Sequence, residues 1–129
     1  MLTQIQKPSN SRPLSELITI SQNAIDAILP QLGPGTGEFN GLGYWQSGNV
    51  WSATANHDKF ANTVTFESSV AENLRNVFSL WPNYDKFGIH RFNDDALWWA
   101  QAALYAYRVY NDTTLLAHAE ATWNNVSPL

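Results

Sequence analysis

The stretch FNDDALWWAQAALYAYRVYND, residues 92–112, decides the fold of this chain. Between Ala96 and Tyr107 its only plainly polar side chain is Gln101, so the segment has no face suited to water. A helix that is apolar on all sides has to be enclosed by other helices. The stretch therefore predicts an inner helix with the rest of the chain arranged around it.

Two amphipathic patterns flank this stretch. Residues 63–81 form the clearer one, with Phe66, Val70 and Leu74 on one side, and Pro82 ends it. Residues 113–124 return to the same spacing and predict an outer helix. Its expected buried stripe consists of Leu115, Leu116, Ala119 and Trp123.

Two more helices are expected nearer the amino terminus. One begins with Ser15 as its cap and ends before Pro30, and the other runs from Tyr44 to about Lys59. The second carries a stripe that is both polar and aromatic, which either forms hydrogen bonds inside the core or lines a wet cavity. That stripe consists of Trp45, Asn49, Ser52 and Asn56. Between the two helices, residues 31–43 hold five of the seven glycines and predict a long, functional loop.

The patterns together define an all-α protein, because no segment alternates with a period of two. Enclosed and amphipathic helices alternate, which suggests two concentric layers of helical hairpins. About five helices cannot close such a ring. Residues 15–129 are therefore expected to be part of a larger domain, or an unusually open one, and residues 1–14 a polar, disordered lead-in.

Composition narrows the class of protein further. The chain is 44% hydrophobic with a net charge of −4, and its seven Lys and Arg are scattered, which argues against binding to nucleic-acid phosphates. The absence of cysteine excludes disulfides and thiolate metal sites. No window approaches the roughly 20 apolar residues of a membrane span. Residues 1–12 lack the apolar core of a signal peptide.

Asp94 and Asp95 are the sharpest local feature, and two interpretations of them stay open. Aspartate is favoured at a helix N-cap and in the first turn, where it meets backbone N–H groups and the positive end of the dipole. Neighbouring carboxylates also repel, so that one of them resists ionising. Glycosidases use such a pair, one carboxylate as nucleophile and the other as proton donor, and adjacent residues match the roughly 5 Å separation of retaining enzymes.

Candidate sugar contacts surround this pair in the sequence. Sugar rings stack on indole faces, and Asn or Gln side chains bind their hydroxyls. Trp45, Gln46, Asn49 and Asn93 are the candidate substrate-binding residues. For Trp45 and Asn49 a core role is an equal alternative, whereas Trp98 and Trp99 fit the core better because they lie within the apolar helix.

The sequence does not indicate a zinc site or a phosphate-binding loop. His57, His90 and His118 stand apart without the spacing of a zinc site, and are expected to be solvated or hydrogen-bonded. The glycine run at residues 33–37 lacks the lysine of a phosphate-binding loop. Neither a metal nor a cofactor is predicted.

Two stretches give the chain a resemblance to a known family. YWQSGNVWSATANH, residues 44–57, and FNDDALWWAQAALYAYRVYND, residues 92–112, resemble the amino-terminal part of family-76 glycoside hydrolases, which are α-1,6-mannanase-like enzymes. TTLLAHAEATWNNV, residues 113–126, is similar to the helix that follows in that family. The resemblance extends from about residue 15 to the end, yet it corresponds to only the opening third of such an enzyme.

The resemblance implies a fold, an activity and a location. It implies an (α/α)6 toroid that cleaves α-1,6-mannosidic linkages with retention, in which Asp94 is the nucleophile and Asp95 the acid/base. The expected partner is α-mannan or another mannose-containing polysaccharide, and the expected location is extracellular or in the cell wall. The alternative is a truncated, non-catalytic helical module that binds carbohydrate or a partner and self-associates through its exposed apolar surface.

Overall fold

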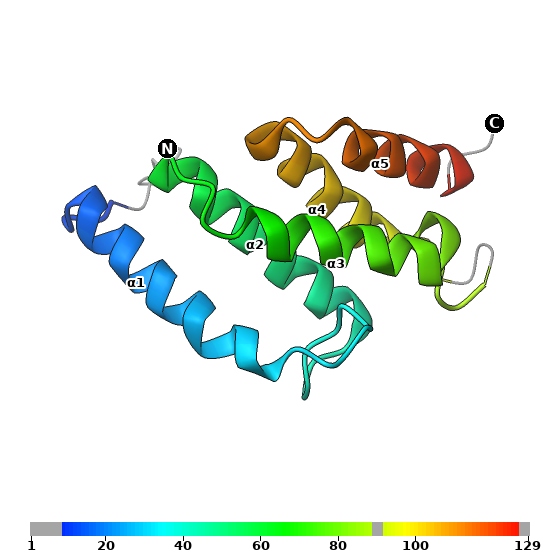
Figure 1. Ribbon diagram of the computed structural model, residues 1–129, viewed down its shortest axis with the longest axis horizontal. Coiled ribbons are helices and arrows are strands. Elements are labelled where there is room, and N and C mark those ends of the chain that lie inside the picture. The colour runs from blue at the N-terminus through cyan, green and yellow to red at the C-terminus, as the bar shows by residue number, and fades with distance from the viewer. Residues whose placement is uncertain (1–8, 89–91, 127–129) are drawn as a thin grey trace, which may run out of the picture.

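The computed structural model describes residues 9–88 and 92–126. Its helices are α1 (Leu14–Ile28), α2 (Tyr44–Ala61), α3 (Glu67–Leu80), α4 (Asn93–Tyr110) and α5 (Thr113–Val126), with short 3-10 turns at Leu29–Gln31 and Pro82–Tyr84 (Figure 1). Within the described ranges the only β pairing is an isolated bridge between Leu32 and Phe39. The prediction of an all-α protein is confirmed. Of the expected lead-in, residues 1–8 lie outside the described residues.

Helix α4 is the centre of the arrangement. It contacts α2, α3 and α5, while α1 packs against α2. Figure 1 accordingly shows α1 at one edge of the molecule and α5 at the opposite edge. The small residues Ala102, Ala103 and Ala106 on α4 are completely buried. Their size allows neighbouring helices to approach α4 closely, as the apolar pattern of this segment predicts.

Trp99 fills the space between α2 and α4. Its ring stacks with Tyr44 at a centroid distance of 5.0 Å and with Tyr84 at 5.9 Å. Its Nε1 donates a hydrogen bond of 3.0 Å to the Tyr44 carbonyl oxygen. Gly48 makes room for the indole, since a Cβ at that position would lie 3.2 Å from the ring. The core role predicted for Trp99 is confirmed.

Other parts of the predicted core are wrong. Trp98 and Leu104 on α4 are 37% and 40% exposed, and Trp123 on α5 is 59% exposed. Helices cover only part of the circumference of α4, and an apolar groove of about 610 Å³ remains open between α4 and α5. Leu104, Leu116 and Trp123 line this groove, so α4 is an enclosed helix on one side only.

The starts of two helices also differ from the prediction. Helix α1 begins at Leu14 with Pro13 at the cap position, so that Ser15 lies within the first turn and is not the cap. Phe66 is the N-cap residue of α3 and does not belong to the helix. The Asp58 carboxylate accepts hydrogen bonds from the backbone N–H groups of Thr65 and Phe66, which holds the chain in a turn before α3.

The glycine-rich loop, residues 31–43, is part of the core. Phe39 is 2% exposed, and its ring lies 5.1 Å from that of Trp51 between centroids. Trp51 Nε1 donates a 2.8 Å hydrogen bond to the Gly37 carbonyl oxygen, and Gly33 N donates one of 2.8 Å to the Glu38 carbonyl oxygen. The observed role of the loop is to close the core beside α2, and the predicted functional role stays a prediction.

Gly37→Ala is expected to destabilise the protein by about 2–4 kcal/mol, because overpacking adds to backbone strain. Gly37 has a φ of +68°, and a Cβ there would lie 2.3 Å from Val77 Cγ2. Gly35 provides a matched control: its φ is +69°, but nothing lies within 4 Å of its Cβ position. Gly35→Ala should therefore cost only about 1 kcal/mol. Urea unfolding of both variants measures the difference, and equal losses would contradict this packing.

Candidate functional site

Asp94 and Asp95 lie in the first turn of α4. The residue at the cap position is Phe92, and among the described residues its side chain makes no capping hydrogen bond. Neither aspartate is therefore the N-cap residue of α4. Both carboxylates still lie at the positive end of the helix dipole. Asp94 is exposed and Asp95 is partly buried. Their different exposure gives the two carboxylates different electrostatic environments.

The environment of Asp95 favours its protonated form. Partial burial, and secondly the charge of Asp94, raise the pKa of the Asp95 carboxyl above its ordinary value. Burial and the surrounding charges, Asp95 among them, raise the pKa of the Tyr44 hydroxyl. An acid-assisted displacement requires one carboxylate to be ionised while the other holds a proton. The raised pKa of Asp95 is a shift in the direction that the proton donor needs.

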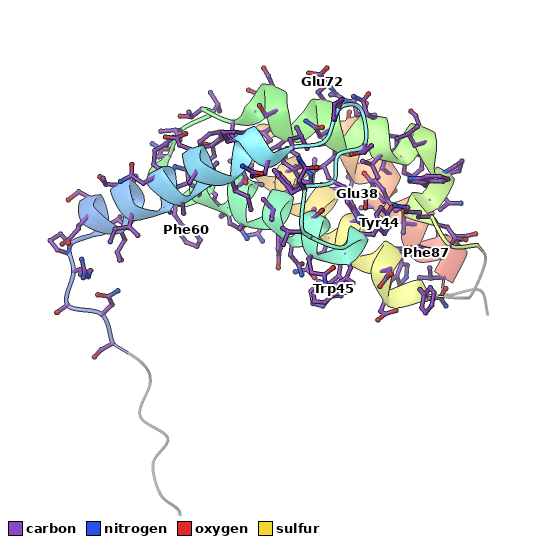
Figure 2. The ribbon with its side chains drawn as sticks, turned by 90° about the horizontal axis from the view of Figure 1, so that it is seen from below. Glu38, Tyr44, Trp45, Phe60, Glu72 and Phe87 are labelled. Atoms are coloured by element: carbon purple, nitrogen blue, oxygen red, sulfur yellow. The ribbon has the colours of Figure 1, made fainter. Side chains whose placement is uncertain are left out.

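An exposed pair of aromatic rings lies beside the carboxylates. Trp98 follows Asp94 by one helical turn, and its ring is 6.1 Å from that of Trp45 on α2, with an angle of 32° between the planes. Trp45 is 40% exposed, in contrast to a core role, and Figure 2 shows it at the surface of the molecule. The two indoles form a platform at the surface, hereafter the Trp45–Trp98 platform.

The three other predicted sugar contacts lie close to these elements. Asn49 follows Trp45 by one turn of α2 and is partly buried, and Asn93 opens α4 just before Asp94. Gln46 Oε1 is buried and lacks a hydrogen-bond partner among the described residues. The structure thus brings Trp45 directly into contact with the α4 turn that follows Asp94.

Lys86 anchors the segment that leads toward α4, and sequence reasoning missed it. Its Nζ lies 2.7 Å from Glu38 Oε2 and 5.2 Å from the centroid of the Tyr44 ring. The rings of Trp81 and Phe87 lie 5.9 and 5.8 Å from the same ammonium group. This cation–π and ionic cluster fixes residues 81–87 against the start of α2. The only feature of the sequence that could have indicated this role of Lys86 is the presence of aromatic residues around it.

Of the three histidines, His57 has the hydrogen-bonded ring expected from the sequence. His57 is 7% exposed, and its ring nitrogens face Ser21 Oγ at 2.5 Å and Gln22 Oε1 at 3.2 Å. His118 stacks on Phe78, with 3.8 Å between ring centroids. His90 lies outside the described residues. Among those described, no three His, Asp or Glu side chains are grouped as a metal site would need.

Acidification is expected to destabilise the protein through His118. Burial, and secondly Arg75, lower the pKa of His118 below its ordinary 6.5, while Asp112 acts in the opposite direction. As the pH falls below about 6.5, His118 is protonated in the unfolded chain but still neutral in the native state. The free energy of unfolding therefore decreases. Urea midpoints at several pH values between 7.5 and 5.5 measure this loss. His118→Gln should show a shallower pH dependence, and an identical dependence would contradict the assignment.

Comparisons with protein-family models, with curated proteins and with solved structures give no match for this chain. In the part of the chain that the structure describes, no helix is both long and apolar enough to cross a bilayer. The assignment of function therefore depends on the geometry around Asp94 and Asp95 and on the sequence resemblance.

Proposed function

We propose that this chain is the carboxylate-bearing part of a glycoside hydrolase that cleaves α-1,6-mannosidic linkages with retention. Asp94 is the nucleophile and Asp95 the acid/base. The observation that carries the proposal is the unequal environment of two adjacent carboxylates: Asp94 is exposed, and the pKa of Asp95 is raised by burial and by Asp94. A protonated Asp95 can donate to the leaving oxygen while Asp94 attacks the anomeric carbon.

The Trp45–Trp98 platform supports a sugar substrate. Both indoles are more than a third exposed, and Trp98 shares a helix face with Asp94. A pyranose ring packed on these faces would lie one helical turn from the proposed nucleophile. Gln46, Asn49 and Asn93 are proposed to bind its hydroxyl groups, since they lie on the same two helices.

The fold is compatible with part of an (α/α)6 toroid, and we propose this architecture for the larger assembly of helices. Helices α4 and α5 are consecutive and pack together, joined by a turn in which Asn111 adopts a left-handed conformation. The open groove between α4 and α5 is where a further helical layer would pack. By resemblance to family 76, the site of action is proposed to be outside the cell or in the cell wall.

A panel of polysaccharides tests this function. Reducing-sugar release should occur from linear α-1,6-mannan, and not from β-1,4-mannan or α-1,4-glucan. Proton NMR of the first products should show retention of the α-configuration at the new reducing end. Release from β-1,4-mannan instead, or initial products of inverted configuration, would overturn the assignment of substrate and mechanism.

A non-catalytic carbohydrate-binding module is the second candidate, and the exposure of the Trp45–Trp98 platform favours it. In this case the protein binds α-1,6-mannan without releasing reducing ends.

Either function predicts that Trp45→Ala weakens mannan binding about two- to tenfold, because a stacked sugar ring loses its partner. Trp123→Ala removes an indole on α5 that is more exposed still, and should leave affinity unchanged. Isothermal titration calorimetry measures both, and equal losses would contradict a platform at Trp45.

A further inference from the structure

A second set of chemically active side chains joins α1 to α2. Ser21 Oγ lies 2.5 Å from His57 Nδ1, and Gln22 Oε1 lies 3.2 Å from His57 Nε2. Gln22 Nε2 in turn donates to the Asp26 carboxylate at 3.1 and 3.3 Å. The four side chains form one continuous hydrogen-bonded series. It is separate from Asp94 and Asp95, which lie on α4.

The series fixes the direction of each hydrogen bond. An ionised carboxylate only accepts, so the Gln22 amide directs its NH2 group to Asp26 and its oxygen to His57. In the neutral ring, His57 Nε2 then carries the proton and donates it to Gln22 Oε1. The unprotonated Nδ1 is left as an acceptor for the Ser21 hydroxyl. This is the arrangement of a serine whose proton can be removed by a neighbouring imidazole.

The Ser21 hydroxyl has a second acceptor within reach. It donates a 2.9 Å hydrogen bond to the Ile18 carbonyl oxygen, one turn earlier in α1. The contact to His57 Nδ1 is shorter by 0.4 Å, from 2.9 and 2.5 Å. His57 as a whole is 7% exposed, so the surrounding protein holds most of its ring. A rotation about the Cβ–Oγ bond of Ser21 turns the hydroxyl hydrogen from the Ile18 carbonyl oxygen to His57 Nδ1, from where it can pass to the ring.

A cavity of about 500 Å³, open to solvent on one side, is lined by Ser21 and His57, and Leu14 and Phe60 in its lining are 60% and 69% exposed. This volume falls within the range of roughly 300–1,000 Å³ that is typical of small-molecule sites. Apart from Ser21, His57 and Asn56, its lining is aliphatic or aromatic, comprising Leu14, Leu17, Ile18, Ala53 and Phe60. Figure 2 shows Phe60 well away from Trp45, Tyr44 and Phe87. The cavity is therefore suited to an uncharged apolar group and is distant from the carbohydrate site.

We propose that Ser21 and His57 form a second active site, which hydrolyses carboxylic esters with an aliphatic acyl chain held in this cavity. Ser21 Oγ attacks the ester carbonyl carbon, and its proton passes to His57 Nδ1. The tetrahedral intermediate collapses, the C–O bond to the alcohol breaks, and His57 Nδ1 returns the proton to the leaving alkoxide. Water then attacks acyl-Ser21 in the same way and releases the carboxylic acid and free Ser21.

Two further residues assist this reaction without forming bonds to the substrate carbon. Gln22 is a positioning residue, because its amide oxygen holds His57 in the required tautomer. Asn56 precedes His57 on α2 and lines the same cavity, where its amide group can donate to the negatively charged oxygen of the tetrahedral intermediate. The site thus contains a nucleophile, a base, an orienting group and an oxyanion donor.

Hydrolysis of p-nitrophenyl butyrate by the full chain tests the proposal. Ser21→Ala is expected to reduce the rate by about a hundredfold or more, in line with the usual contribution of an activated nucleophile and base. Ser15→Ala, an exposed serine of the same helix, is the matched control and should retain the wild-type rate. Equal rates in wild type and Ser21→Ala, or an absence of hydrolysis by a folded wild type, would overturn the proposal.

Covalent labelling provides a second measurement that does not depend on turnover. A fluorophosphonate probe should add to Ser21, as located by peptide mass spectrometry, and His57→Gln should suppress the labelling while circular dichroism remains unchanged. Labelling of another serine, or unchanged labelling in folded His57→Gln, would contradict the mechanism. The Asp94→Asn/Asp95→Asn variant should retain full ester hydrolysis, which separates this site from the proposed glycosidase.

Discussion

Asp94→Asn should lower the hydrolysis of linear α-1,6-mannan by about a thousandfold or more, because an amide cannot form the glycosyl-enzyme ester. Asp95→Asn should cause a similar loss on mannan, since the leaving sugar oxygen then lacks its proton donor. The two variants should differ on an aryl α-mannoside with a good leaving group. Asp95→Asn should still form the glycosyl-enzyme from that substrate, whereas Asp94→Asn should remain inactive until azide is added as a substitute nucleophile.

Asp85→Asn is the matched control for these variants. Asp85 is a nearby carboxylate that precedes Lys86 and has no assigned role in the reaction. Its variant should therefore turn over mannan at nearly the wild-type rate. Normal turnover by Asp94→Asn or by Asp95→Asn, with circular dichroism spectra matching the wild type, would exclude the proposed catalytic pair.

Asp58→Ala is expected to destabilise the fold by about 3–5 kcal/mol, a large share of the roughly 5–15 kcal/mol that holds a domain of this size. The Asp58 carboxylate is completely buried. It accepts hydrogen bonds from Thr63 Oγ1 at 2.6 Å, Thr65 N at 3.2 Å, Phe66 N at 2.9 Å and Tyr110 Oη at 2.6 Å. Removal of the carboxylate leaves these donors without a partner where α2, α3 and α4 meet.

Thermal unfolding measures this loss, which should lower the midpoint by about 10–20 °C. Tyr110→Phe removes only one of the donors and leaves the carboxylate with three protein partners, so it should cost about 1–2 kcal/mol. A midpoint for Asp58→Ala equal to that of Tyr110→Phe would mean that the carboxylate does not organise the start of α3.

Sequence periodicity predicted the existence and order of the five described helices because each carries a strong local signal. Apolar spacing marked α3 and α5, Pro82 marked the end of α3, and the lack of polar residues marked α4. Helix starts were less accurate. Phe66 has the spacing of a helical residue, yet a carboxylate eight positions earlier holds its N–H group in a turn. A long-range hydrogen bond of this kind leaves no periodic pattern.

The exposure of individual aromatic residues could not be predicted from sequence. Trp98 and Trp99 are neighbours in the same apolar segment, but they point about 100° apart on the helix. Trp99 is buried against α2, where Gly48 leaves space for it. Trp98 meets Trp45 at the surface instead. Which of the two indoles is buried depends on the partner helix, so spacing within one segment cannot decide it.

The candidate sites differ in how far sequence could reveal them. The Asp94–Asp95 pair is visible because the residues are adjacent, and its catalytic role stays a prediction. Ser21 and His57 are 36 positions apart and meet only because α1 packs against α2. Their pairing, like the cluster around Lys86, required the tertiary structure.

Reducing-sugar release from linear α-1,6-mannan by the purified chain, measured beside its Asp94→Asn/Asp95→Asn variant, tests the central claim most directly. Circular dichroism should confirm that both proteins are folded. The catalytic-pair account predicts release by the wild type and none above background by the double variant. Equal release by the two proteins, or a folded wild type that releases nothing, would contradict the assignment of Asp94 and Asp95 as the catalytic pair of this chain.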